Sequence, residues 1–380
     1  MLAKYFSIIG DPVLIPQWTL GWNQAKWGYR SVQDMQDVLD NYKKYNIPID
    51  TQYIDIDYMQ DYEDYTYNNK SFAGLPDFID RLHNQSMKVV PILDAGVAVK
   101  PNQSYYSYDS GVARDVFMKI NEEPFVGSVW PGDAVYPDFF KNETTPWWHE
   151  QIDRFYQEVN FDGLWLDMNE VSNFCNGVCK DSQKVASPIK NLLPYTPSGS
   201  DLEWHSASLD VYHSNGYLQL DTHSYWGTQE VKATHEWFQS RGQRTLIVER
   251  SSFAGMGKFG SRWLGDNFAS KTQMGHSVQG VMLMNMFGIP LVGADICGFE
   301  SLSFAELCSR WHVVGAFYPY SRNHKMQYFP LELPWSYMGQ YESGVTYFDI
   351  MKKAIYQKYS MIRYYYSELL LISQGSNTGF

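Results

Sequence analysis

Short apolar runs alternate along the chain with longer stretches in which apolar residues recur at helical spacing. An apolar run of roughly four to eight residues is typical of a buried strand, whereas the longer amphipathic stretches are typical of helices. Strands are expected at 20–24, 52–57, 89–94, 163–167, 245–250, 263–266, 289–295 and 317–322. Helices are expected at 31–45, 75–85, 147–159, 232–240, 270–284, 303–314 and 351–372.

This alternation predicts an α/β fold with a parallel sheet and crossover helices. Eight strand–helix pairs match a (β/α)8 TIM barrel, whose catalytic face lies at the carboxyl ends of the strands. One barrel domain is expected over residues 1–380. The connections 95–160 and 171–231 are longer than ordinary loops and follow the third and fourth predicted strands. They are therefore expected to be insertions on the catalytic face.

Nearly every predicted strand ends in a charged or polar residue. The fourth strand runs from Gly163 into Asp167, and Glu170 follows three residues later. One acid at such a position could be a helix N-cap. Several acids at one barrel mouth repel one another, and a fold tolerates this mainly where acid and base are needed. The other strand-end residues are Asp55, Asp57, Asp94, Arg250, Asp266, Asn267, Asp295, Arg322, Asn323 and His324.

Composition narrows the chemistry that these residues could perform. The net charge is −12 and no basic block is present, so neither nucleic acid nor an anionic membrane is an expected partner. No apolar run is long enough for a transmembrane helix. The zinc-binding spacings and the glycine-rich nucleotide fingerprint are absent, so no metal and no cofactor is expected. Aromatic residues make up 17% of the chain, which suits either core packing or stacking on sugars.

Paired carboxylates in a barrel of this composition favour glycoside hydrolysis. In that reaction one carboxylate attacks or stabilises the anomeric carbon, and the other delivers a proton to the leaving oxygen. Asp167 is the expected first member of the pair. On the spacing alone, the second member is either Asp266 or Asp295.

Cysteines and glycosylation sequons bear on the compartment. The four cysteines, Cys175, Cys179, Cys297 and Cys308, could form two local disulfides. Asn-x-Ser/Thr sequons occur at Asn69, Asn84, Asn102 and Asn142, which is weak support for a secretory route when taken alone. The N-terminal segment does not have the pattern of a secretion signal.

The strand-end motifs together resemble glycoside hydrolase family 31, the α-glucosidase family. The similarity is strongest to the branch with maltase, sucrase-isomaltase and lysosomal acid α-glucosidase, and Trp165-Leu-Asp-Met-Asn-Glu170 resembles its nucleophile motif. The similarity is weaker to the α-xylosidase and endoplasmic-reticulum glucosidase branches, which differ at 55–57 and 165–167. Further motifs stand in the family's order at 12–18, 27–29, 55–59, 250–253, 263–267, 293–299 and 317–324.

The resemblance implies a retaining exo-α-glucosidase that releases terminal α-1,4-linked glucose from maltose-type oligosaccharides or glucans. Asp167 would be the nucleophile that forms a covalent glycosyl-enzyme intermediate, and Asp266 would be the general acid/base. Arg250 would lie near the nucleophile and hold it ionised. Glu170 would steady the nucleophile strand from outside the sugar pocket, and Asp94 could act similarly.

The resemblance also implies a set of substrate-binding positions. Acids and a histidine would bind the hydroxyls of the terminal glucose, aromatic residues would form the pocket walls, and apolar residues would line it. Core packing is the competing explanation for each aromatic residue. The positions are Asp55, Ile56, Ile92, Trp130, Trp165, Met168, Arg250, Trp263, Asp295, Phe299 and His324.

The family's secreted and lysosomal members imply a Cys297–Cys308 disulfide, while the pairing of Cys175 with Cys179 stays open. A disulfide indicates an oxidising compartment, so the secretory pathway is expected, with a lysosomal, vacuolar or extracellular destination. The β-sandwich domains that flank the family's barrel have no counterpart in these 380 residues. The alternative hypothesis is therefore an inactive barrel fragment that only binds carbohydrate. A third is another retaining hydrolase, active on β-glucosides.

Overall fold

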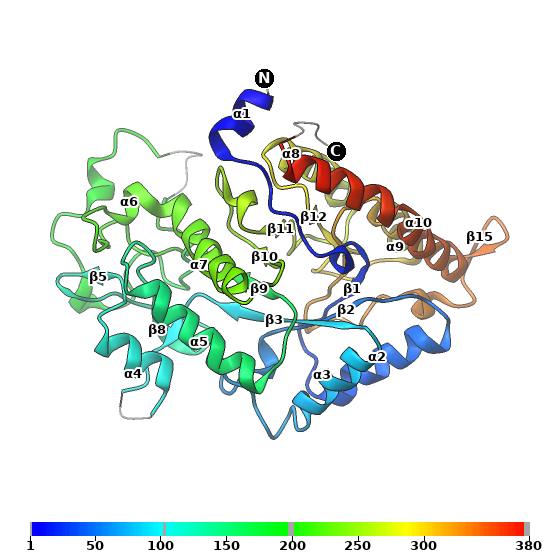
Figure 1. The fold of residues 1–380 in the computed structure, drawn as a ribbon, viewed down its shortest axis with the longest axis horizontal. Helices are drawn as coiled ribbons and strands as arrows, with labels where there is room; N and C mark the ends of the chain where they lie inside the picture. Colours follow the sequence, from blue (N-terminus) through cyan, green and yellow to red (C-terminus); the bar gives the residue numbers. More distant parts are fainter. Residues whose placement is uncertain (1, 102–103, 197–200, 376–380) are drawn as a thin grey trace.

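Parallel strands close into a barrel in the computed structural model, which describes residues 2–101, 104–196 and 201–375 (Figure 1). The strand order is β12-β11-β10-β9-β3-β2-β1-β14-β13, and β12 and β13 are two halves of one strand interrupted at Ala294. That divided strand pairs with β11 on one side and with β14 on the other, which closes the barrel. The barrel strands are β1 Trp22–Gln24, β2 Thr51–Ile54, β3 Lys88–Asp94, β9 Leu164–Asp167, β10 Ile247–Glu249, β11 Ser261–Trp263, β12 Val292–Gly293, β13 Asp295–Ile296 and β14 Ser321–Asn323.

The strands are buried on both faces, as expected of a parallel sheet covered by helices. Their register brings the strand ends to one level. Asp94 pairs with Asp167, and Asp295 pairs with Arg322. The polar residues that end neighbouring strands therefore gather at one mouth of the barrel.

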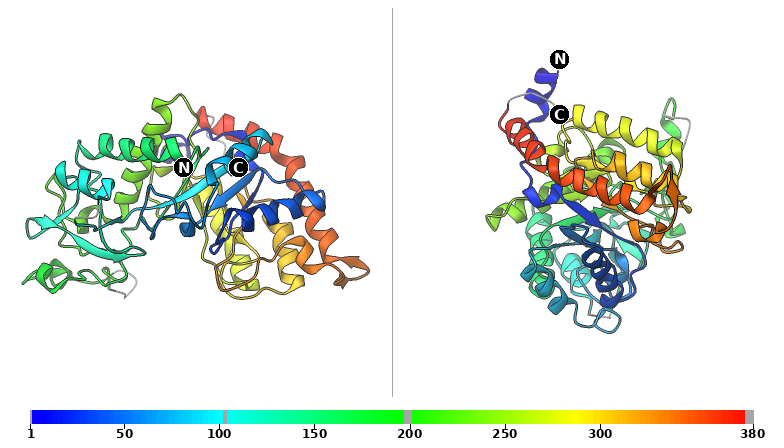
Figure 2. Two further views of the ribbon diagram at one scale, coloured as in Figure 1. Left: turned by 90° about the horizontal axis from the view of Figure 1, so that it is seen from below. Right: turned by 90° about the vertical axis from the view of Figure 1, so that its right-hand side faces the viewer.

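Helices cover the outside of the barrel (Figure 2). They are α2 Val32–Lys44, α3 Leu75–Asn84, α5 Thr144–Glu158, α7 Trp226–Ser240, α8 Lys271–Met286, α9 Ala305–Gly315 and α10 Tyr347–Ser373. The helices expected from the sequence leave one step of the barrel, between 250 and 263, without an α-helix, and the structure agrees. The connection from β10 to β11 contains only a 3-10 helix, η7 Met256–Lys258, because residues 250–260 are too few for a crossover helix.

Side-chain caps mark the starts of three helices. Ser31, Ser270 and Thr346 each accept a hydrogen bond from the backbone N–H three residues later, which fixes the starts of α2, α8 and α10. Helix α7 starts six residues before its predicted start, although Gly227 lies in its first turn. A Cβ at Gly227 would come within 2.6 Å of the Asn169 carbonyl oxygen, so this glycine lets the helix approach the segment after β9.

The segments between β3 and α5 and between β9 and α7 form a lobe beside the barrel (Figure 1, left). The first holds a three-stranded antiparallel sheet and a hairpin, and the second consists mainly of turns. They pack together: the Phe174 N–H donates to the Ser128 carbonyl at 2.8 Å, and Asn173 Oδ1 accepts from the Ser128 N–H at 2.9 Å. Their elements are β4 Val97–Ala98, α4 Tyr106–Ala113, β5 Lys119–Ile120, β6 Glu123–Pro124, β7 Val126–Val129, β8 Gly132–Val135, η3 Asp181–Gln183, η4 Ile189–Leu192, α6 Gln219–Thr222 and η6 His223–Tyr225.

The remaining elements lie at the chain ends and in short connections. They are α1 Leu2–Ile9, η1 Gln17–Leu20, η2 Ile56–Tyr58, η8 Pro334–Tyr337 and the hairpin of β15 Tyr341–Glu342 with β16 Val345–Thr346. Two disulfides are present, Cys297–Cys308 and Cys175–Cys179, so the pairing that the sequence left open is local. None of the helices in the described ranges combines the length and the apolar character needed to cross a membrane.

Candidate active site

Arg250 connects the two carboxylates that were expected to be catalytic. Its Nη1 atom lies 3.0 Å from Asp167 Oδ1 and 3.7 Å from Asp266 Oδ2. These two oxygens cannot be farther apart than the sum of the two distances. This upper limit falls at the short end of the carboxyl separation of about 6.5–9.5 Å found in inverting glycosidases. It leaves room for the separation of about 5–5.5 Å found in retaining enzymes.

The backbone turns sharply at both acids, and this aims them into the barrel mouth. Met168, directly after Asp167, has a φ of 59°, and its N–H donates to Asp167 Oδ1 at 2.8 Å. Asp266 itself has a φ of 59°, and its N–H donates to Asp295 Oδ2 at 3.1 Å. Non-glycine residues adopt this conformation rarely, and such residues cluster at functional sites.

The two acids differ in exposure. The Asp167 side chain is 14% exposed and the Asp266 side chain is 49% exposed. Arg250 and the Met168 N–H both contact Oδ1 of Asp167, and Oδ2 has no hydrogen bond from the described residues. This arrangement suits a fixed nucleophile in the pocket and a more accessible proton donor at its rim.

Burial raises the pKa of Asp167 to about 6, although the Arg250 cation opposes the shift. Burial also raises the pKa of Asp266 to about 6, and the charge of Asp295 adds to the effect. Arg250 thus acts in the expected direction, toward the ionised form of Asp167, but desolvation of the carboxylate outweighs it in the net shift of the pKa.

Glu170 was expected to steady the strand that carries Asp167, and its carboxylate binds Arg250. Its carboxylate accepts two hydrogen bonds, from Arg250 Nε at 2.8 Å and from Nη2 at 2.9 Å. Burial alone would raise the pKa of Glu170, but the hydrogen bonds and charge of Arg250 lower it below its usual value. Glu170 therefore stays ionised and fixes the plane of the guanidinium.

Four further polar side chains face the interior of the mouth. Asp295 forms a buried ion pair with Arg322 at 3.0 Å, and Asp55 Oδ2 lies 3.5 Å from His324 Nε2. Arg322 Nε and Nη1 and His324 Nδ1 are buried without a hydrogen-bond partner among the described residues. Buried donors of this kind cost free energy unless a ligand or water satisfies them, so the mouth is built to receive polar groups.

Aromatic rings surround these polar groups. Trp165 and Trp263 meet edge to face at 5.3 Å, and the indole N–H of each lacks a partner among the described residues. The His324 ring stacks on Phe299 at 4.8 Å. The Trp130 ring packs against Trp27 and Phe174, with ring centroids 5.3 Å and 5.0 Å apart. The apolar positions Ile56, Ile92 and Met168 are buried as well, at 3%, 1% and 5% exposure.

Sequence reasoning missed three residues of this region. Arg322 ends the eighth strand and was noticed only as a strand end. The ring centroid of Trp27 lies 5.3 Å from that of Trp130 and 6.3 Å from that of Phe299, so Trp27 belongs to the same group of aromatic rings. Asp64 Oδ1 accepts a hydrogen bond from the Asp94 N–H at 2.8 Å. Asp64 sits in a loop without a motif, so no pattern in the sequence indicated it.

One group of residues in the described ranges has the spacing of a metal site, namely Cys297, Cys308 and His312. Both sulfur atoms are joined in the disulfide, so neither is a free thiolate ligand. His312 Nδ1 lies 2.9 Å from the Cys308 carbonyl oxygen, and its ring stacks on Trp22. These three residues are buried in the core next to β13, the strand that begins with Asp295.

The fold and the site match one family of hydrolases. Residues 12–368 match the family model described as the glycosyl hydrolases family 31 TIM-barrel domain, so the chain belongs to this family. The chain is 40% identical over 351 residues to intestinal sucrase-isomaltase of Oryctolagus cuniculus, covering 90% of this chain and 19% of that protein. Lysosomal alpha-glucosidase of Rattus norvegicus is 35% identical over 379 residues, covering 97% and 38%.

The similarity does not separate glucosidases from xylosidases. Alpha-xylosidase 1 of Arabidopsis thaliana is 38% identical over 356 residues, covering 87% of this chain and 39% of that protein. A crystal structure of a glucosidase II alpha subunit superimposes with a TM-score of 0.86 at 26% identity, over 100% of this chain and 38% of the other. The chain thus spans well under half the length of these relatives.

Proposed function

We propose that the chain is the catalytic barrel of a retaining exo-α-glucosidase that releases terminal α-1,4-linked glucose from oligosaccharides or glucans. The observation that carries this proposal is the single Arg250 nitrogen shared by Asp167 and Asp266. Sharing this nitrogen keeps two carboxylates of different exposure near each other, which supports a double-displacement mechanism, whose carboxyl groups lie about 5–5.5 Å apart. The activity of α-glucosidases among the relatives agrees with it.

In the first step, Asp167 Oδ2 attacks the anomeric carbon as the glycosidic C–O bond breaks. Protonated Asp266 gives its proton to the departing oxygen, so a glucosyl ester forms on Asp167. In the second step, the Asp266 carboxylate takes a proton from water, and the water oxygen attacks the anomeric carbon. This breaks the ester and restores the Asp167 carboxylate, with two inversions giving net retention.

The interior of the barrel explains why only a chain end would react. Arg322, Trp165 and Tyr53 are fully or almost fully buried below the acids, and the Arg322 guanidinium lies over the Trp165 ring at 4.4 Å. A polysaccharide cannot thread through this packed interior. The terminal sugar would enter with its hydroxyls toward Asp55, Asp295 and His324.

An α-xylosidase is the second candidate, because a relative with that name is 38% identical to the chain. Xylose differs from glucose only by lacking the hydroxymethyl group, so both sugars would engage the same acids. Comparing kcat/KM for aryl α-glucoside and aryl α-xyloside separates the two. Preference for the xyloside would overturn the glucosidase assignment. If an aryl β-glucoside is tested as well, preference for it would contradict the proposed specificity for α-linked sugars.

Covalent trapping tests the mechanism independently of turnover. A 5-fluoro-α-glucosyl fluoride reacts quickly with a retaining enzyme but leaves slowly, so we expect one sugar adduct on the peptide that contains Asp167. Asp167→Asn should abolish the adduct, whereas Asp77→Asn, an acid on the outer helix α3, should leave it intact. A chain that binds the reagent without an adduct would instead support the carbohydrate-binding fragment.

We further propose a secretory route for the protein. The two disulfides require an oxidising compartment. The sequon asparagines Asn69, Asn84 and Asn142 are exposed, and Asn102 lies outside the described residues. Endoglycosidase treatment of the protein from its native cells should lower its mass, and an unchanged mass would count against this route. A lysosomal, vacuolar or extracellular destination would follow from localisation of the full protein.

A further inference from the structure

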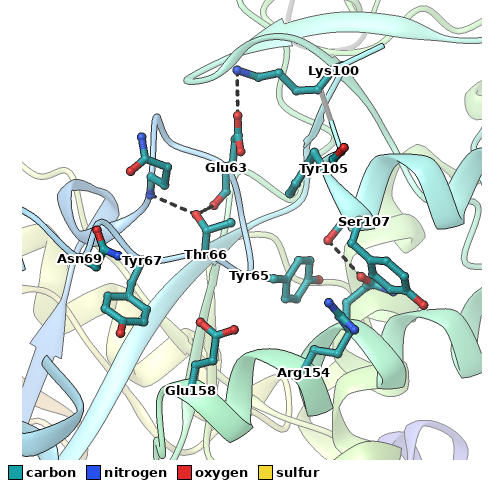
Figure 3. A pocket seen from close by; sticks show the side chains of 14 residues that line it. Glu63, Tyr65, Thr66, Tyr67, Asn69, Lys100, Tyr105, Ser107, Arg154 and Glu158 are labelled. Carbon is teal, nitrogen blue, oxygen red and sulfur yellow. Dashed lines mark hydrogen bonds and ion pairs between the residues drawn. The ribbon is translucent and has the colours of Figure 1, made fainter. Parts of the chain in front are cut away.

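A cavity of about 430 Å³ lies away from the residues of the proposed active site (Figure 3). Three segments line it: the loop 60–69 after β2, the start of α4, and the last two turns of α5. Its size falls within the range of roughly 300–1,000 Å³ that is typical of small-molecule sites. None of the catalytic or substrate-binding candidates borders it.

Among the described residues, the lining contains tyrosines and polar side chains but no aliphatic residue and no phenylalanine. Apolar ligands are therefore poorly matched. The charged side chains balance, since Glu63 and Glu158 stand against Lys100 and Arg154. Lys100 Nζ is already paired with Glu63 at 2.7 Å. A strongly charged ligand would have no net opposite charge to bind, so the lining favours a neutral polyhydroxylated molecule.

Tyr65 provides the second, independent observation. Its ring is held edge to face by Trp148 at 5.6 Å and by Phe155 at 6.4 Å, and the residue is 9% exposed. Its hydroxyl is buried and lacks a hydrogen-bond partner among the described residues. In Figure 3 this side chain lies between the loop and the Arg154 side chain of α5. A rigid tyrosine with an unsatisfied hydroxyl is a preformed contact for a polar ligand.

Open hydrogen-bonding groups accompany this hydroxyl. Arg154 stacks over the Tyr106 ring at 3.9 Å, which fixes the guanidinium plane while its N–H groups stay available. Glu158 is exposed and makes no ion pair within the described ranges. Figure 3 shows Tyr67 beside Glu158, so a ring and a carboxylate flank one part of the cavity.

We propose that this cavity is a second saccharide-binding site, distinct from the catalytic pocket. Tyrosine rings offer flat faces to sugar rings, and Tyr65, Arg154 and Glu158 offer a mixed donor and acceptor set for hydroxyls. Two sources could supply the same chemistry. One is an α-glucan chain in solution, and the other is an N-glycan on Asn69, whose side chain borders the cavity within a sequon.

Hydrogen–deuterium exchange with maltotetraose tests the proposal without relying on catalysis. We expect the sugar to slow exchange in 60–69 and 151–158, both in the natural protein and in Asp55→Asn, which weakens only the catalytic pocket. Tyr65→Phe should raise the half-saturating concentration at the cavity by about three- to tenfold. Its Tm should stay unchanged, because no protein contact of the hydroxyl is lost. Glu158→Gln should weaken binding similarly, and its neighbour Gln157→Ala should not.

The glycan source is separated by Ser71→Ala, which removes the sequon. If the Asn69 glycan occupies the cavity, glycosylated protein should show slow exchange in 60–69 without added sugar. Ser71→Ala should lose that protection and gain protection by maltotetraose. Either pattern supports saccharide recognition. The proposal is overturned if neither source protects these segments, or if Tyr65→Phe and Glu158→Gln bind as the natural protein does. Trapping at Asp167 reports the proposed function separately.

Discussion

At the scale of single residues, the site depends on how one guanidinium is shared. Arg250 contacts Asp167, Asp266 and Glu170 together, so it can act only if its planar fork is held in place. Glu170 supplies that hold through two hydrogen bonds. Asp167 and Asp266, the proposed catalytic acids, thus form one electrostatic unit with Arg250 and Glu170, and a change to one member alters the others.

Two replacements of Arg250 should distinguish the effect of its charge from the effect of its planar, multidentate shape. Arg250→Met removes the cation, so the pKa of Asp167 should rise further and the acidic limb of the kcat/KM profile should move to higher pH. Arg250→Lys keeps the charge but cannot span three carboxylates, so it should shift that limb less while still lowering kcat by about a hundredfold. Arg241→Lys, on the surface, is the matched control. An unmoved acidic limb in Arg250→Met would contradict this account.

The pH profile of the natural protein should be bell-shaped with its maximum near pH 6. Activity should fall in acid because Asp167 becomes protonated, and fall in alkali because Asp266 loses its proton. The two apparent values belong to the pair, since the groups interact. With an activated aryl glucoside that needs no proton donor, Asp266→Asn should retain the acidic limb and lose the alkaline one. A maximum above pH 8 would rule out these pKa assignments.

At the scale of elements, the close approach of α7 to the segment after β9 helps to position β9, the strand that ends in Asp167. That contact requires Gly227, because any Cβ there would meet the Asn169 carbonyl oxygen. Asn169 in turn donates to Glu249 on β10 at 3.0 Å and accepts from the Ser251 N–H at 2.9 Å. A glycine that weakens a helix locally therefore supports the contacts that hold the segment after β9 against β10.

Gly227→Ala should lower both stability and activity. The added methyl group must push α7 away from Asn169, and we expect a loss of about 1–3 kcal/mol in the free energy of unfolding. Gly275→Ala is the control, because that position in α8 has open space around it. It should instead stabilise the protein by about 0.5–1 kcal/mol through helix propensity. Chemical denaturation of both variants checks this, and equal effects would refute the role of the close approach.

At the scale of the whole molecule, the core holds several acids for which burial outweighs the effect of any nearby cation. Burial raises the pKa of Asp55, Asp64, Asp94 and Glu230 well above their usual values, and raises that of Glu249 to about 8. In the unfolded chain these groups titrate near pH 4. Between these values the folded state binds more protons than the unfolded state, so its stability falls as pH rises.

We therefore expect the protein to be most stable at mildly acidic pH and to lose stability progressively from about pH 5 to pH 8. The transition midpoint in urea, followed across this range, measures the effect. Glu249→Gln keeps an acceptor for Asn169 but cannot ionise, so it should flatten the decline in the upper part of the range. A midpoint that rises from pH 5 to pH 8 would show that these acids are ionised in the folded state.

The sequence by itself determined the barrel, the order of its strands and the positions of Asp167 and Asp266 at strand ends. Apolar runs and helical spacing are local patterns, and the polar residue at each strand end is visible in the chain. The sequence also indicated Arg250 as a neighbour of Asp167. It did not indicate that burial would outweigh this cation in setting the pKa of Asp167. Trp27 stood in the motif at 27–29, but that motif did not indicate its contacts with Trp130 and Phe299. Asp64 lay in no motif at all and acts through a contact with a distant segment.

Only the tertiary structure decided which groups touch and how much water they lose. The raised pKa of Asp167 depends on desolvation by all the surrounding elements, which no local pattern encodes. The same is true of the grip of Glu170 on Arg250, the need for Gly227, and the cavity around Tyr65. Each results from segments that are far apart in the chain, because packing and dielectric environment are properties of the folded molecule rather than of any stretch of it.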